Sequence, residues 1–427
     1  MSAPRGATVD AVTVDARSEH SGGDNRIAAF DVVRSVVLIG VFTMNYVVEW
    51  NLGELRRVSW EQIDAPAALR SFMNPWTGPL STRFAATLST LVGVGVVLLS
   101  SRSIGSGDSA AINEDRWRLR RRGLLFVLAG IFFDVVWPGE ILHFIGLYLI
   151  IAAWAITWSA PTLGLSAVGV AAMTALQRVA VFVSVGGQER QSWWSGFGSD
   201  GTRSIGRPRG FLSSVLSWGG HPVLPWMTFV FVGMAIAKLE LRSRRLRVIL
   251  MISGIGGLAA GYAMRFVGQA ALSAKWDWVA STEPGGFGRI SPFGGGMPAY
   301  VVSTVGSSVF FLIGTMWLAE RFASVLPIRI LARAGKVTFS LYVAHGVIPW
   351  LIVSQGWVGQ DFGLVRSLAI ALASWALAVM FGAAMQRVFG TGPLEWLLRK
   401  VSGPAVRSGS GAVTSVPASV RTAGVDR

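Results

Sequence analysis

The sequence predicts an all-α integral membrane protein, a polytopic bundle of about ten transmembrane helices with both termini in the cytoplasm. Of the 427 residues, 52% are hydrophobic and only 14% are charged, whereas roughly a quarter of the residues of a soluble domain are charged. Apolar segments near the ~20 residues that a helix needs to cross a bilayer recur along the chain. The basic residues gather in connections that would share one side of such a bundle.

Ten apolar segments form the predicted transmembrane helices. They are residues 28–48, 84–101, 122–137, 141–158, 162–185, 222–238, 247–268, 299–319, 337–354 and 365–389. Three connections between them, 102–122, 238–247 and 320–336, are rich in Arg and Lys. In a ten-helix arrangement all three lie on the same side as both termini. The positive-inside rule makes that side the cytoplasm of a multi-pass protein of the cell membrane.

The two ends of the chain differ in composition from its apolar middle. Residues 1–25 are small and polar and lack the apolar centre of a signal peptide, so we expect a disordered cytoplasmic leader. Residues 401–427 have a similar Ser, Gly and Pro content and are expected to form a disordered cytoplasmic tail. The transmembrane domain is therefore predicted to comprise residues 26–400.

The composition excludes several kinds of site. The chain has no cysteine, which rules out disulfides, thiolate metal sites and cysteine nucleophiles. It also lacks the GxxxxGK[ST], HExxH and GxSxG motifs, so we expect no metal and no ATP-driven transport. The formal net charge of +15 would suggest nucleic acid for a soluble protein. Here the arginines border apolar segments, so the expected partner is the lipid bilayer and not nucleic acid.

An acidic and a basic residue stand in the first apolar segment. Asp31 and Arg34 are three residues apart and share one helix face, so each can neutralise the other within the membrane. A structural ion pair and a binding site for a cytoplasmic anion both agree with this spacing.

Three histidines lie in or near apolar segments and are candidate catalytic residues. His143 and His221 are expected near the external face, and His345 closer to the middle of the membrane. A buried neutral histidine is usually a satisfied hydrogen-bonding group, but histidine is also well suited to proton transfer near neutral pH. Glu140 precedes His143 by three residues and could orient its imidazole, so it joins the catalytic candidates.

Two further polar residues are placed at membrane depth. Asn45 lies at the outer end of the first segment and Arg83 at the start of the second. Both are candidate substrate-binding residues, and both could instead be paired structural groups.

The order of several motifs resembles that of two related membrane families. "FDVVRSVVLIGVFTMN" resembles the opening of the YeiB-like bacterial family of unassigned function and of the heparan-alpha-glucosaminide N-acetyltransferase family. "STRFAATLSTLVGVGVVLL", "EILHFIGLYLI" and "HPVLPWMTFVFVGMAIAKL" are similar to their second, fourth and sixth helices. "AGKVTFSLYVAHGVIPW" and "TGPLEWLLRK" resemble the closing helices of the YeiB-like group. The resemblance covers most of residues 26–400.

The resemblance implies that an acyl group passes from cytoplasmic acyl-coenzyme A, such as acetyl-coenzyme A, to a small hydroxylated acceptor or envelope glycan outside. It places Asp31 and Arg34 on the donor side. The other residues that would hold the coenzyme phosphates are Arg120, Arg121 and Arg122. A histidine near the external face would act as general base or acyl carrier.

The chain departs from the acetyltransferase pattern at one functional position. That family carries its catalytic histidine in the external segment between the first two helices, and here this segment, 49–83, contains no histidine. The three candidate histidines are therefore chosen on physical grounds alone.

Two other classes of function remain open. Buried charges within a helical bundle suit a carrier or exporter of a metabolite or lipid equally well. A structural or regulatory membrane component without turnover is the third possibility. Stabilisation of the folded protein by acyl-coenzyme A would discriminate an acyltransferase from a transporter. The oligomeric state and the identity of the acceptor are not predicted by the sequence.

Overall fold

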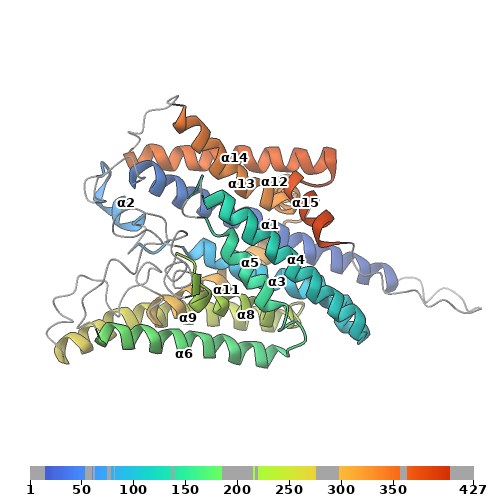
Figure 1. Ribbon diagram of the computed structural model, residues 1–427, viewed down its shortest axis with the longest axis horizontal. Helices are drawn as coiled ribbons and strands as arrows, with labels where there is room; N and C mark the ends of the chain where they lie inside the picture. The colour runs from blue at the N-terminus through green and yellow to red at the C-terminus, as the bar shows by residue number, and fades with distance from the viewer. Residues whose placement is uncertain are drawn as a thin grey trace, which may run out of the picture.

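The computed structural model of the chain is a bundle of helices (Figure 1). The structure describes residues 15–52, 60, 63–74, 78–80, 82–134, 136–137, 140–184, 215–216, 220–275, 298–355 and 363–403. The regular elements in these ranges are all helical, in agreement with the predicted all-α fold.

Within the described ranges, six helices are long and apolar enough to cross a membrane. They are α1 (Asp15–Leu52), α3 (Arg83–Ser106), α6 (Ala160–Ser184), α9 (Arg244–Lys275), α11 (Pro298–Arg321) and α14 (Gly363–Phe389). Each coincides with one of the ten predicted spans. The chain is therefore an integral membrane protein.

The other four predicted spans fall on helices that are shorter or more polar. α4 (Ser109–Asp134) contains most of the segment 122–137, but its first half is rich in arginine. α5 (Leu142–Ala152) and α8 (Val223–Ala237) are apolar but have only 11 and 15 residues, which at ~1.5 Å per residue is less than the ~30 Å of a hydrocarbon core. α13 (Thr338–Ser354) has 17 residues. The count of ten spans stays a prediction.

Short helices mark the two ends of the bundle. α2 (Ala67–Phe72) lies at one end, and α12 (Leu326–Ala334) and α15 (Pro393–Ser402) lie toward the other, where α1 and α4 begin (Figure 1). We call the second end the basic end because the arginine-rich start of α4 is there. Its assignment to the cytoplasm rests on the positive-inside rule and stays a prediction.

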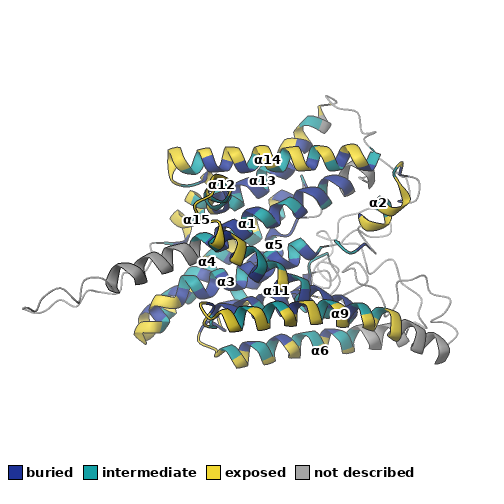
Figure 2. Ribbon diagram, turned by 180° about the vertical axis from the view of Figure 1, so that it is seen from behind, coloured by how far each residue is buried: buried dark blue, intermediate teal, exposed yellow. Residues whose placement is uncertain are grey.

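Burial separates the inner helices from the outer ones (Figure 2). In the most apolar stretch of α1, 72% of the residues are buried within the protein, against 11% in α9 and 17% in α6. The outer helices expose large apolar side chains such as Leu165, Phe266 and Leu377. A surface of this kind is stable against lipid but not against water.

Two glycines bring α3 and α8 into close contact. A Cβ atom on Gly93 would overlap the carbonyl oxygen of Val230, and one on Gly233 would overlap that of Thr90. Small residues commonly allow membrane helices to approach at this distance. α8 is thereby held against the inner helix α3.

α15 is joined to the start of α13 by one glutamate, Glu395 of the "TGPLEWLLRK" segment. Its Oε1 accepts hydrogen bonds from the backbone N–H groups of Phe339 (2.7 Å) and Ser340 (3.0 Å), and its Oε2 accepts one from the Ser340 hydroxyl at 2.5 Å. The Ser340 Oγ in turn accepts from the backbone N–H of Leu394 at 3.2 Å. Each helix therefore satisfies free amide groups at the start of the other.

The structure leaves the predicted domain boundaries as predictions. α1 already begins at Asp15, within the segment assigned to the leader. At the other end, α15 extends to Ser402, and residues 404–427 of the predicted tail lie outside the described residues.

Candidate functional site

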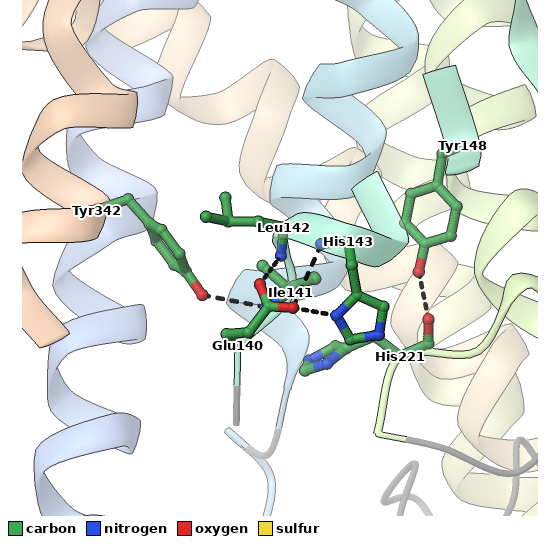
Figure 3. A network of polar contacts seen from close by, with 7 residues as sticks. All are labelled: Glu140, Ile141, Leu142, His143, Tyr148, His221 and Tyr342. Carbon is green, nitrogen blue, oxygen red and sulfur yellow. Dashed lines mark hydrogen bonds and ion pairs between the residues drawn. The ribbon is translucent and has the colours of Figure 1, made fainter. Parts of the chain in front are cut away.

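The candidate site is centred on the pair of Glu140 and His143 at the start of α5 (Figure 3). Glu140 is 2% exposed, and its Oε1 accepts a hydrogen bond from Nδ1 of the His143 ring. The same oxygen accepts from the His143 backbone N–H at 3.3 Å, and Oε2 accepts from the Leu142 backbone N–H. The positive end of the α5 dipole favours a negative charge at this position. Glu140 therefore both caps α5 and orients the imidazole.

A glycine in α4 makes room for this pair. A Cβ atom on Gly130 would overlap the backbone nitrogen of His143 and lie 2.8 Å from the Glu140 Oε1. One turn of α4 can therefore pass directly over the start of α5.

The hydrogen bond to Glu140 determines which His143 nitrogen is basic. A carboxylate oxygen only accepts, so Nδ1 carries the proton and Nε2 has a free lone pair. No described residue forms a hydrogen bond with this Nε2, and the His143 side chain is 15% exposed. An imidazole oriented by a carboxylate, with its other nitrogen free, is the arrangement that general-base catalysis requires.

The structure places His221 close to this pair. His221 interacts electrostatically with His143, and the Phe144 ring contacts both, with its centroid 3.8 Å from that of the His143 ring and 5.8 Å from that of the His221 ring. The Tyr148 hydroxyl donates to the His221 carbonyl oxygen at 2.6 Å. The site thus contains His221, just before α8, in addition to the predicted pair of Glu140 and His143.

Two tyrosines of the site were not predicted from the sequence. Tyr148 lies on α5, and Tyr342 reaches the site from α13, where its hydroxyl accepts from the backbone N–H of Ile141 at 3.2 Å. Both tyrosines interact electrostatically with Glu140. Tyr148 belongs to the same "EILHFIGLYLI" motif as His143, so the sequence could have predicted it as a site residue. Tyr342 could not be predicted in this way, because its partner Ile141 is 201 positions away in the sequence.

His345 occupies a separate, closed environment. It is 3% exposed, its Nδ1 donates to the Tyr342 carbonyl oxygen, and its Nε2 accepts from the Asn45 side-chain amide at 2.9 Å. The Phe42 ring stacks on it with the centroids 4.8 Å apart. Because both nitrogens have partners, this geometry favours a structural role for His345, and it gives Asn45 the role of holding that ring.

The predicted pair of Asp31 and Arg34 is formed within α1. The Arg34 Nη1 lies 2.5 Å from the Asp31 Oδ1, and the side chains are 29% and 5% exposed. Lys336 also interacts electrostatically with Asp31. The Arg34 guanidinium lies beside Gly95 of α3. The cation is therefore accessible, whereas the carboxylate is covered.

The arginines of α4 do not converge on one point. The Arg120 guanidinium lies over the Trp154 ring, 4.6 Å from its centroid. Arg121 pairs with Glu114 at 3.3 Å, and the Arg122 Nε donates to the Ser402 Oγ at 3.2 Å. Consecutive residues of a helix point about 100° apart, which accounts for the different partners. Sequence proximity alone therefore does not make these three residues one phosphate site.

Arg83, the other predicted substrate-binding residue, is buried between α3 and α11. It is 7% exposed and its guanidinium donates to the Pro79 carbonyl oxygen at 2.6 Å and to three hydroxyls of α11.

A match to a known family covers the second part of the chain. Residues 233–403 match a family described as "Protein of unknown function (DUF418)". No curated protein matches the chain. The match includes Tyr342 and His345 but begins after Glu140, His143 and His221 in the sequence. It supports the resemblance to the YeiB-like group of unassigned function, and the relation to acetyltransferases stays a prediction.

The described residues offer no ready metal centre. Among them, no group of three or more His, Cys, Asp or Glu is placed to hold a metal ion.

Proposed function

We propose that this protein transfers an acyl group from cytoplasmic acyl-coenzyme A to a hydroxyl of an extracytoplasmic acceptor, with His143 as the general base. The observation that carries the proposal is the hydrogen bond from His143 Nδ1 to the buried carboxylate of Glu140, with Nε2 left free. The resemblance to the acetyltransferase family supplies the choice of donor.

The reaction follows from that geometry. His143 Nε2 takes the proton of the acceptor hydroxyl while the oxygen bonds to the thioester carbonyl carbon. The carbon–sulfur bond then breaks, and the imidazolium returns the proton to the leaving coenzyme A thiolate. Glu140 stabilises the imidazolium between these two steps. The products are the acylated acceptor and free coenzyme A.

Arg34 is the proposed binding residue for the donor phosphates. Its guanidinium is partly exposed, and guanidinium groups bind phosphate oxygens through paired hydrogen bonds. α1 rises about 16 Å between Arg34 and Asn45, and Asn45 contacts His345, which is linked through Tyr342 to Ile141 beside Glu140. A donor arm that follows α1 would therefore lead from Arg34 toward His143.

The test uses the purified full-length protein and labelled acetyl-coenzyme A. We expect the donor to raise the apparent melting temperature and the label to be released or transferred. His143→Gln should reduce turnover by about 10²–10⁴-fold, as is typical for loss of a general base, without abolishing stabilisation by the donor. His20→Gln, in the predicted leader, is the matched control and should be unchanged.

Two results would contradict this proposal. One is the absence of both donor stabilisation and turnover in the unmodified protein. The other is turnover that persists when His143, His221 and His345 are replaced together. Solute flux coupled to ions or membrane potential, without an effect of acetyl-coenzyme A, would establish the transporter instead.

A further inference from the structure

Arg83 is a buried cation whose described partners are neutral. Its Nε donates to the Pro79 carbonyl oxygen, its Nη1 to the hydroxyls of Thr304 and Ser307 at 3.2 Å each, and its Nη2 to the Ser303 hydroxyl at 3.0 Å. None of the ion pairs within the described part of the chain involves Arg83. An ionised group removed from water without an opposite charge is strongly unfavourable.

The hydroxyls orient this guanidinium but do not neutralise it. The Ser303 hydroxyl donates to the Tyr300 carbonyl oxygen at 3.1 Å, and the Ser307 hydroxyl donates to the Thr304 carbonyl oxygen at 3.0 Å. Each hydroxyl therefore accepts from Arg83 and donates to the backbone of α11. The guanidinium therefore keeps its positive charge and is held in one orientation.

The start of α3 adds to the positive potential around Arg83. Arg83 is the first residue of α3, whereas its hydroxyl partners lie in the second and third turns of α11. The start of a helix carries a partial positive charge from its free N–H groups. Positive contributions thus meet at one buried point, as in sites that bind anions.

An aromatic layer connects Arg83 with the histidine site. The Tyr300 hydroxyl forms a hydrogen bond with the hydroxyl of Thr82, the residue before Arg83, at 2.9 Å, and Tyr148 donates to the His221 carbonyl oxygen. Edge-to-face ring contacts also run from Tyr300 through Phe229 and Trp226 to His221, with centroid distances of 6.3, 5.4 and 4.6 Å. Arg83 therefore belongs to the same end of the bundle as the candidate base.

We propose that Arg83 binds an anionic group, a carboxylate or phosphate, of the acceptor, and so holds the reacting hydroxyl toward His143. This inference rests on the proposed acyl transfer for the role of the bound molecule. It predicts an acidic acceptor, such as a sugar acid or sugar phosphate, in preference to a neutral sugar. Four of the five N–H groups of Arg83 are taken by the Pro79 carbonyl and the three hydroxyls, so either anion would bind through the positive charge and the remaining N–H on Nη2.

The first experiment measures anion binding without the donor. The melting temperature of the purified full-length protein is followed against inorganic phosphate, glucuronate, glucose 6-phosphate and neutral glucose at constant ionic strength. We expect stabilisation by the anions and none by glucose. A response to glucuronate alone or to the phosphates alone identifies which acidic group the site prefers.

Variants locate the effect. Arg83→Gln should abolish the stabilisation, and Arg83→Lys should weaken it because an ammonium group, with three donors, cannot bind the hydroxyls and the anion together. Ser303→Ala retains the cation but releases one of its anchors, so the half-maximal anion concentration should rise several-fold, which keeps the test valid if Arg83→Gln does not fold. Arg102→Gln, an exposed change at the other end of α3, is the control.

The outcomes separate this inference from the proposed function. No anion effect on the unmodified protein, or an equal effect on Arg83→Gln, overturns the inference, as would be found if an acidic side chain of the same chain already neutralised Arg83. Anion stabilisation that depends on Arg83, but without turnover of acetyl-coenzyme A, retains the site and removes the acyl transfer. Turnover with a neutral acceptor, without any anion effect, retains the acyl transfer and removes the anion site.

Discussion

His143 and His345 carry the same side chain but differ in the number of their hydrogen-bond partners. His143 has one partner, the Glu140 carboxylate, and a side chain that is partly exposed. His345 has partners at both nitrogens and is closed in by aromatic rings. The first can take up a proton from a bound molecule, whereas the second is already fully used within the protein.

Replacement of His345 should therefore affect stability more than that of His143. His345→Ala leaves the Asn45 amide and the Tyr342 carbonyl without their partner and opens a cavity, so we expect a loss of about 3–5 kcal/mol in unfolding free energy. His143→Gln should cost at most about 1–2 kcal/mol. Denaturant unfolding in detergent, followed by tryptophan fluorescence, checks both values. Equal losses would contradict the assignment of the two roles.

Glu395 gives a second prediction for a single side chain. Glu395→Gln retains one acceptor oxygen but turns an amide NH₂ toward Ser340 or the N–H groups at the start of α13. We expect a loss of about 1–2 kcal/mol, the usual effect of a lost helix cap. The control is Glu114→Gln, since its half-exposed ion pair with Arg121 should contribute little. The melting temperatures of the two variants should differ clearly.

The spacing of residues predicted some contacts of the site and not others. The pairs Asp31–Arg34 and Glu140–His143 follow from a separation of three residues, which fixes a common helix face. The contact of Tyr342 with Ile141 depends on how α13 packs, which no local pattern encodes.

At the scale of the elements, glycine contacts determine how closely the inner helices pack. α3 and α8 meet at Gly93 and Gly233, and α4 meets α5 at Gly130. Because these contacts are between backbones, a side chain cannot be added without moving a whole helix. The glycines were visible in the sequence, but which of them lie at a contact was not.

Gly233→Ala should therefore destabilise the protein. The added methyl overlaps the Thr90 carbonyl oxygen, and we expect a loss of about 1–3 kcal/mol. Gly169→Ala on α6 is the matched control, because a Cβ atom at that position has no neighbour within 4 Å. There the better helix propensity of alanine should leave stability unchanged or slightly improved. A similar loss in both variants would argue against the close contact.

At the scale of the whole molecule, composition predicted the membrane class but not the depth of each helix. The six longest apolar helices were recognised because length and hydropathy suffice for them. An apolar run does not reveal where a helix begins relative to the bilayer. α5 and α8 have 11 and 15 residues within the predicted spans 141–158 and 222–238, and their crossing of the bilayer stays a prediction.

The orientation of the bundle can be tested by labelling, because the chain has no native cysteine. Single cysteines are introduced at three exposed positions in the basic connections, Asp108, Glu240 and Ser324, and at Ala68 in α2. In intact cells a membrane-impermeant maleimide should label only the variant at position 68, since the positive-inside rule places the other three in the cytoplasm. Labelling of the three basic-side variants before the membrane is opened would reverse the orientation.

The three N–H groups that donate to Glu140 also bear on how many protons the site handles in each reaction cycle. Its oxygens already accept from these donors, so in the proposed acyl transfer the imidazole is the group that receives the proton of the acceptor hydroxyl. In that proposal one proton is held at a time, and it leaves with the thiol product. A catalytic cycle of this kind is electroneutral, and its rate should not respond to the voltage across the bilayer.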